Sequence, residues 1–329
     1  MDSPEQPGHE RKRDRLVNET RQLIADWDAV LNPPDRDLYF EFEGEIPPFQ
    51  TGKLDRFSVT NAWWLAELCR LAYTPDAKEA GRFWNREKPP RRAMLEGKTT
   101  FREIHSVHKT GNHASIYLGE SEGSRPFTVL CFRGTSKFRQ WVMNFTASPR
   151  GWEFIDRNRG ITGAFVHSGF DIFFKRIWPK LHHKLLALPR PFVFTGHSLG
   201  GALANLAAVE ERPDLLVTFG APKAGNAGFS KLLDEIPHHR LINDLDLVPH
   251  VPPADPGAGE REFFHSGSRI FLGRQGQIVD SVQPGLDESL DPLHLLREAF
   301  RQPVPPACVV DHLMVSYCRK LRAGVGINE

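Results

Sequence analysis

The hexapeptide Gly196-His197-Ser198-Leu199-Gly200-Gly201 places a serine midway between two glycines. It follows an apolar run at 192–195 and precedes an apolar helical run at 199–211. A strand that turns sharply into a helix at a serine exposes the hydroxyl at the sheet edge, and the flanking glycines remove side chains that would collide there. The helix N-terminus also favours negative charge that develops beside it. The pattern therefore predicts that Ser198 is a catalytic nucleophile.

A serine hydroxyl is a weak nucleophile until a histidine takes its proton and an acid orients that histidine. When the serine lies on a turn of this kind, the acid follows it along the chain, and the histidine comes last. The acid is expected just after a later strand, and the strand predicted at 239–243 is followed by Asp244 and Asp246. The spacing alone fits either aspartate.

Several histidines lie beyond this strand. His250 is too near Asp246 in sequence to reach a distant serine easily. His265 stands at the start of a strand, where a packed histidine is commoner than a catalytic one. His312 lies on a late loop before the last helix and can fold back over the sheet edge. The pattern favours His312 and leaves His265 and His294 as alternatives.

The elements that must position these side chains alternate between buried strands and amphipathic helices. This alternation predicts an α/β fold with a mostly parallel sheet covered by helices on both faces. A Pro- and charge-rich stretch at 286–306 is expected to form a surface excursion. The strands are predicted at 101–107, 114–118, 127–132, 192–195, 215–219 and 239–243, and the helices at 16–31, 61–73, 168–187, 199–211, 226–235 and 311–321.

Composition narrows the class of protein. The chain has 329 residues, with 42 Lys+Arg against 41 Asp+Glu, so it has no global field that would favour nucleic acid as a partner. Four cysteines without metal-ligand spacing, and the absence of an HExxH motif, indicate neither a disulfide scaffold nor a metal site, and no cofactor is expected. Residues 1–14 are predicted to be a frayed tail, and 15–329 a single domain.

No window approaches the roughly 18 apolar residues of a transmembrane helix. The N-terminus also lacks the apolar stretch of a signal peptide. The expectation is a cytoplasmic protein, or a secreted one if a signal segment has been removed. The oligomeric state is left open.

Six ordered segments, spread between residues 132 and 312, resemble motifs of the class 3 lipases, the fungal-lipase-like branch of the α/β-hydrolases. One departure is that an aromatic residue usually follows the late histidine more closely than Tyr317 does here. The segments are Phe132-Arg133-Gly134-Thr135, Val166-His167-Ser168-Gly169-Phe170, the hexapeptide at 196–201, Thr218-Phe219-Gly220-Ala221-Pro222 with Gly225-Asn226, the run from Asn243 to Pro249, and Asp311-His312.

The resemblance implies roles that the spacing left open. It assigns the acid to Asp246 and the histidine to His312. An oxyanion hole needs two donors aimed at the substrate oxygen. The turn itself supplies the backbone N–H of Leu199, and the resemblance adds the backbone N–H of Thr135, with help from its hydroxyl. The alternative is that Thr135 only caps the helix that follows.

Directly after Thr135, Phe138, Trp141, Val142 and Phe145 recur at i, i+3, i+4 and i+7, which predicts one apolar face of a short helix. In the family that the chain resembles, this position near 136–150 is a lid over the acyl-binding site. A fixed surface helix packed on the core is the alternative.

The resemblance therefore implies a serine carboxylic-ester hydrolase, most simply a triacylglycerol lipase that acts through an acyl-enzyme. Its expected partner is a lipid or other ester substrate at an oil–water or membrane interface. A phospholipase A1 or a feruloyl-type esterase on the same fold is an alternative. A non-catalytic, lipase-like interaction protein is another, but the triad and oxyanion positions are intact. A metal-dependent hydrolase is disfavoured because the adjacent histidine pairs cannot face one site together.

Overall fold

The computed structural model of the protein describes residues 24–31, 39–42, 44–74, 91–109, 112–120, 125–135, 137–146, 148–152, 163–279 and 291–325. The predicted tail at 1–14 lies outside the described residues. So does the first part of the helix predicted at 16–31, from which only α2 (Trp27–Leu31) is described.

Within these residues, a central sheet has the strand order β1-β2-β3-β6-β7-β9-β11-β12. Strands β3, β6, β7, β9 and β11 run parallel to one another, which confirms the predicted mostly parallel sheet. The two ends differ, because β1, β2 and β12 pair antiparallel with their neighbours. The bounds are β1 Phe101–Lys109, β2 Asn112–Gly119, β3 Phe127–Phe132, β6 Phe192–His197, β7 Leu215–Phe219, β9 His238–Asn243, β11 Ser268–Leu272 and β12 Ile278–Val279.

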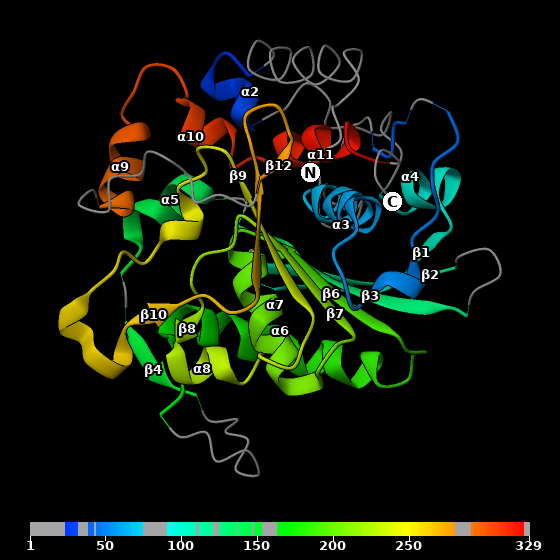
Figure 1. The fold of residues 1–329 in the computed structure, drawn as a ribbon, viewed down its shortest axis with the longest axis horizontal. Helices are drawn as coiled ribbons and strands as arrows, with labels where there is room; N and C mark the ends of the chain where they lie inside the picture. The colour runs from blue at the N-terminus through cyan, green and yellow to red at the C-terminus, as the bar shows by residue number, and fades with distance from the viewer. Residues whose placement is uncertain are drawn as a thin grey trace, which may run out of the picture.

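Helices cover both faces of this sheet, and alternate residues of each central strand face opposite layers (Figure 1). In β3, Leu130 belongs to the core cluster that includes α6 (Ser168–Leu185) and α7 (Leu199–Glu211), whereas Val129 belongs to the cluster that includes α3 (Val59–Leu71) and α11 (Met314–Arg322). Strands buried on both faces are near-continuously apolar, as β3 and β6 are. The remaining helix on the N-terminal side is α4 (Arg91–Lys98), which packs near β1.

A second, smaller sheet has the order β10-β8-β5-β4. Asn226 connects its parts: its Oδ1 accepts hydrogen bonds from the backbone N–H groups of Phe165 (2.9 Å) and Phe229 (3.0 Å), and the latter bond caps α8 (Ala227–Lys231). The sequence did not predict this sheet, because strands of two or three residues show no periodicity. The strands are β4 Pro149–Gly151, β5 Phe165–His167, β8 Gly225–Asn226 and β10 Phe263–Phe264.

The prediction of a surface excursion at 286–306 is wrong for residues 292–299. Residues 292–299 form α9 (Pro292–Ala299), and Leu293 and Leu296 are buried in the same core cluster as α7. The Asp291 side chain caps α9 by accepting the backbone N–H of Leu293 at 2.9 Å. The surrounding prolines and charges hid a short amphipathic helix.

The last predicted helix, 311–321, corresponds to α11, which begins three residues later, at Met314. His312 lies in the turn between α11 and a short preceding helix, α10 (Ala307–Val310). Short 3-10 turns complete the chain at Thr51–Lys53, Val248–His250 and Pro256–Arg261.

Candidate active site

Ser198 lies at the sharp turn between β6 and α7. Its backbone has φ 57° and ψ −129°, a conformation that is costly for any residue with a side chain. The Ser198 N–H donates to the carbonyl oxygen of Phe219 in β7 at 2.9 Å, which holds the turn against the neighbouring strand. The serine therefore has the strained strand-to-helix position that its sequence context predicts.

The glycines around Ser198 allow three backbones to meet. A Cβ atom on Gly196 would lie 2.3 Å from the carbonyl oxygen of Gly200, and one on Gly200 would lie 2.2 Å from that of Phe132. One on Gly134 would lie 3.0 Å from Cβ of Ser198. The loop after β3 thus approaches the serine as closely as backbone atoms can.

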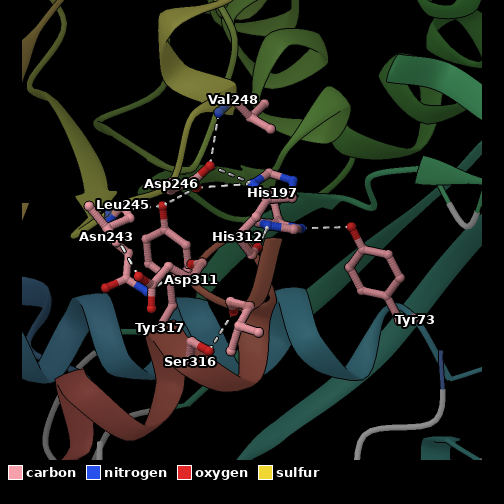
Figure 2. A network of polar contacts seen from close by, with 11 residues as sticks. Tyr73, His197, Asn243, Leu245, Asp246, Val248, Asp311, His312, Ser316 and Tyr317 are labelled. Atoms are coloured by element: carbon pink, nitrogen blue, oxygen red, sulfur yellow. Dashed lines mark hydrogen bonds and ion pairs between the residues drawn. The ribbon is translucent and has the colours of Figure 1, made fainter. Parts of the chain in front are cut away.

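Asp246 and His312 form a buried acid–base pair on the loops after β9 and α10 (Figure 2). Nδ1 of His312 is 3.0 Å from each carboxylate oxygen of Asp246, and both side chains are at most 2% exposed. Because a carboxylate only accepts, Nδ1 carries the proton and Nε2 is left as a base. The structure thus brings Asp246 to His312. By contrast, Nε2 of His265 bonds the carbonyl oxygen of Pro249, and His294 lies exposed on α9.

Two further donors fix the carboxylate of Asp246. The backbone N–H of Val248 donates to Oδ1 at 2.9 Å, and the hydroxyl of Tyr317 donates to Oδ2 at 2.7 Å (Figure 2). Tyr317 lies one turn inside α11, so it reaches the acid despite its larger separation from His312 along the chain. Burial, and then Asp246, raise the pKa of Tyr317 well above its ordinary value, so Tyr317 stays a donor.

Gly220 leaves room for this arrangement. It has φ +53°, and a Cβ atom there would lie 2.5 Å from Oδ2 of Asp246 and 3.1 Å from both Nδ1 of His312 and the Tyr317 oxygen. The end of β7 therefore has to carry glycine for both conformational and steric reasons.

Oγ of Ser198 and Nε2 of His312 are both buried, and neither has a hydrogen-bond partner among the described residues. The preceding residue brings their backbones together, because Nε2 of His197 bonds the carbonyl oxygen of His312 at 2.7 Å. The imidazole rings of His197 and His312 also pack against each other, with centroids 4.6 Å apart. The lack of a hydrogen bond between Oγ of Ser198 and Nε2 of His312 is compatible with catalysis, because catalytic hydrogen bonds are often long before substrate binds.

Thr135 lies half-buried on the loop that reaches Ser198. Its Oγ1 accepts the backbone N–H of Lys137 at 3.0 Å, so the hydroxyl orders the start of the following turn. Leu199 is the first residue of α7, where backbone N–H groups have no partner within the helix. The oxyanion roles of Thr135 and Leu199 remain predictions.

Helix α5 (Phe138–Asn144) covers the acid–base pair. The ring of Phe138 stacks on that of His312 with centroids 4.5 Å apart. Val142 and Phe145 are buried in the core cluster of α6 and α7, and Trp141 packs partly buried against it. Arg297 of α9 donates from Nη2 to the carbonyl oxygen of Phe145 at 3.1 Å. The predicted apolar face therefore turns inward.

Two residues of this site were missed by the sequence analysis. Because the carbonyl oxygen of His312 only accepts, Nε2 of His197 donates to it, and Nδ1 of His197 must accept the hydroxyl proton of Tyr73, 2.7 Å away. Tyr73 also touches the loop after β3, since a Cβ atom on Gly134 would lie 2.2 Å from its oxygen. His197 occupies the variable position beside the serine, which was the only available signal.

Buried neutral histidines should make the fold sensitive to acid. Burial, the largest cause, lowers the pKa of His197, His238 and His265 well below the ordinary value. As the pH falls below about 6.5, the unfolded chain takes up protons that the folded chain does not, so up to about 1.4 kcal/mol of stability per histidine is lost for each pH unit. We expect the melting temperature to fall between pH 7.5 and 5.5, as followed by circular dichroism.

The matched variant is His238→Gln, which removes one of these groups far from the triad. Its melting temperature should fall by less over the same pH interval than that of the unsubstituted protein. Equal losses in the two proteins would contradict this explanation.

Among the described residues, no three His, Cys, Asp or Glu side chains gather where they could hold a metal ion. None of the helices in this part of the chain is both long and apolar enough to cross a membrane.

Residues 129–255 match the family model of the class 3 lipases, and this segment carries most of β3, Ser198 and Asp246. This segment is similar to the class 3 lipases. The chain is 30% identical over 218 residues to the lipase of Rhizomucor miehei, a match that covers 61% of this chain and 54% of that protein. It is 34% identical over 159 residues to the lipase of Rhizopus niveus, with 44% and 38% covered.

A third relative is the secreted mono- and diacylglycerol lipase 1 of Fusarium solani, 30% identical over 161 residues, with 46% of each chain covered. The chain thus spans about half or less of the length of these curated relatives.

Solved structures show the same fold. The crystal structure of a lipase from Rhizopus microsporus var. chinensis has a TM-score of 0.53 at 21% identity, covering 83% of this chain and 93% of that chain. A mutant of MDLA from Penicillium cyclopium has a TM-score of 0.55 at 20% identity, covering 80% and 98%. The α/β-hydrolase fold predicted from the sequence is confirmed.

Proposed function

We propose that this protein is a class 3 lipase, a carboxylic-ester hydrolase that uses Ser198, His312 and Asp246, and that its substrate is a triacylglycerol. The observation that carries the proposal is the buried Asp246–His312 pair beside a strained serine. The relatives named as lipases support the choice of substrate class. Residues 15–329 are proposed to act as one hydrolase domain, and a cytoplasmic location stays a prediction.

In this mechanism, Oγ of Ser198 attacks the ester carbonyl while Nε2 of His312 takes its proton. The backbone N–H groups of Leu199 and Thr135 stabilise the negative charge on the tetrahedral intermediate. His312 then passes the proton to the leaving alcohol, which yields an acyl-enzyme on Ser198. Water, deprotonated by His312, releases the fatty acid and regenerates the serine.

We propose that α5 is a lid that moves to admit substrate. Oγ of Ser198 is buried, and Phe138 stacks on the ring of His312, and both observations support this role. At an oil surface, the side chains of Phe138 and Trp141 would exchange contacts with the protein for contacts with lipid. The apolar face of α5 would then add to the surface of the protein that contacts the lipid.

The lid predicts a step in the rate. Hydrolysis of tributyrin should rise steeply once its concentration exceeds its solubility, because only the oil surface stabilises the open position. Phe138→Ala should raise the rate below the solubility limit and shrink the step, since it removes the contact on His312. The measurement is initial rate by pH-stat titration, with soluble p-nitrophenyl acetate as the control ester. A smooth saturation curve across the limit would count against a mobile lid.

A phospholipid is the second candidate substrate. The phospholipase A(1) DAD1 of Arabidopsis thaliana is 29% identical over 148 residues, covering 38% of this chain and 33% of that protein. A panel of triacylglycerols, phosphatidylcholine and a feruloyl ester, each offered as a dispersed substrate, decides among them. Faster release of fatty acid from phosphatidylcholine than from tributyrin would replace the proposed substrate.

Tyr73 offers a test of how the site is held. Tyr73→Phe leaves Nδ1 of His197 without its donor, and an unpaired buried acceptor costs about 1–3 kcal/mol. We expect kcat for p-nitrophenyl butyrate to fall by about tenfold, with little change in KM. Tyr39→Phe is the matched control, because the Tyr39 hydroxyl bonds Thr74 away from the triad. Equal kinetics in the two variants would contradict a link between Tyr73 and the triad.

A further inference from the structure

A group of basic side chains lies on strands β9 and β11 and on the loops beside them. Arg240 of β9 and Arg269 of β11 are directly opposite each other in the parallel register, so their side chains leave the same face of the sheet. Lys223, on the loop after β7, donates its backbone N–H to the carbonyl oxygen of Val251 at 2.8 Å, which places it beside the turn that carries His250. Lys223, Arg240, His250 and Arg269 are called the cationic cluster.

The charge of Arg240 is largely removed from water, and no ion pair joins it to a carboxylate among the described residues. Its Nε is buried and has no hydrogen-bond partner among the described residues. The pKa of Arg240 is lowered to about 10, first by burial and then by the neighbouring Arg269. A buried charge next to a like charge is destabilising unless an anion compensates it.

Burial and neighbouring charges connect the other members of the cationic cluster to Arg240. Nε2 of His250 is also buried and without a partner in the described part of the chain. Lys223, Arg269 and Arg240 all lower the pKa of His250, after burial, while Asp246 raises it. Glu262 raises the pKa of Lys223, whereas among the described residues the pKa of Arg240 is lowered by burial and by Arg269. Arg269 is exposed, so the cluster opens to solvent.

We propose that the cationic cluster is a binding site for a phosphate group. Neighbouring strands lie about 4.8 Å apart, so two planar guanidinium groups face one ligand from adjacent strands. A tetrahedral phosphate has enough oxygens to accept from both arginines and from His250 at once, whereas a planar carboxylate is satisfied by one arginine. The phosphate is either a free anion or the headgroup of a lipid.

This site shares no residue with the proposed catalytic one, and His250 is the member of the cluster whose pKa Asp246 affects. Arg240 lies in the middle of β9, whereas Asp246 follows the end of that strand. The inference does not depend on ester hydrolysis, and its test needs no activity measurement.

The test is a titration of the full chain with inorganic phosphate at constant ionic strength, with chloride as the balancing anion. We expect a saturable rise in melting temperature and a dissociation constant from calorimetry. Arg240→Gln should weaken the affinity at least about tenfold, because it removes charge-assisted hydrogen bonds. Arg269→Gln, at an exposed position, gives the same test if Arg240→Gln does not fold. Arg102→Gln, an exposed arginine of β1, is the control and should bind like the unsubstituted protein.

The absence of a saturable rise would overturn the proposal, as would equal affinity in the folded Arg240→Gln and Arg102→Gln variants. Co-flotation with phosphatidylcholine vesicles that contain phosphatidic acid distinguishes the source. Flotation that is lost in Arg240→Gln assigns a lipid headgroup. Binding of inorganic phosphate without flotation assigns a free anion. Flotation together with unchanged phosphate affinity in Arg240→Gln counts against the site.

Discussion

Replacing Ser198 by alanine is expected to reduce the hydrolysis of p-nitrophenyl acyl esters to the background rate, a loss of about 10⁶-fold in kcat. The variant removes the atom that forms the acyl-enzyme and leaves its surroundings in place. Since Oγ of Ser198 has no hydrogen-bond partner among the described residues, its loss breaks no hydrogen bond within that part of the chain. The fold should therefore keep its melting temperature.

Ser230→Ala is the matched control, because Oγ of Ser230 in α8 is likewise buried and unpartnered within the described chain. It should keep full activity. A fluorophosphonate probe should label the Ser230→Ala protein and fail to label Ser198→Ala, which separates loss of the nucleophile from loss of folding. Turnover retained by Ser198→Ala would remove the proposed mechanism.

Asp246→Asn should have the second largest effect, about 10⁴-fold in kcat. Three donors converge on this carboxylate, from Val248, Tyr317 and His312. An amide offers only one oxygen, so at least one donor then faces an NH₂ group. His312 is expected to shift its proton to Nε2, where it can no longer accept from Ser198.

Tyr317→Phe is the graded comparison for that variant. It removes one donor and keeps the charge, so the proton of His312 stays on Nδ1, and we expect a loss of about tenfold in kcat. Kinetics and melting temperature, measured for both variants, check the order. A larger loss in Tyr317→Phe than in Asp246→Asn would show that the acid does not orient His312.

The nucleophile could be predicted from sequence because its structure is local. The glycines at 196 and 200, the apolar strand before them and the helix after them lie within one continuous stretch, and each constrains the backbone of Ser198 directly. The same holds for α5, whose apolar spacing matches the face that packs inward. Short-range periodicity carries this information.

The acid and the histidine were harder, because the spacing left Asp244 and His265 open until the family motifs were used. The contacts that decide between these residues join positions 66 apart along the chain. Tyr73 reaches His197 across 124 positions, and no local pattern marks such a partner. Helix α9 was missed for a different reason, since its apolar residues are diluted by prolines and charges.

Gly220 has a consequence for how this chain can vary. Its backbone conformation and the three polar side chains packed against it exclude larger residues independently, so no single compensating change elsewhere restores a substitution there. Asp246, His312 and Tyr317 thus all pack against one residue at the end of β7, and almost no substitution is tolerated there. Evolution of a new substrate preference would have to proceed through the covering helices, leaving this strand end untouched.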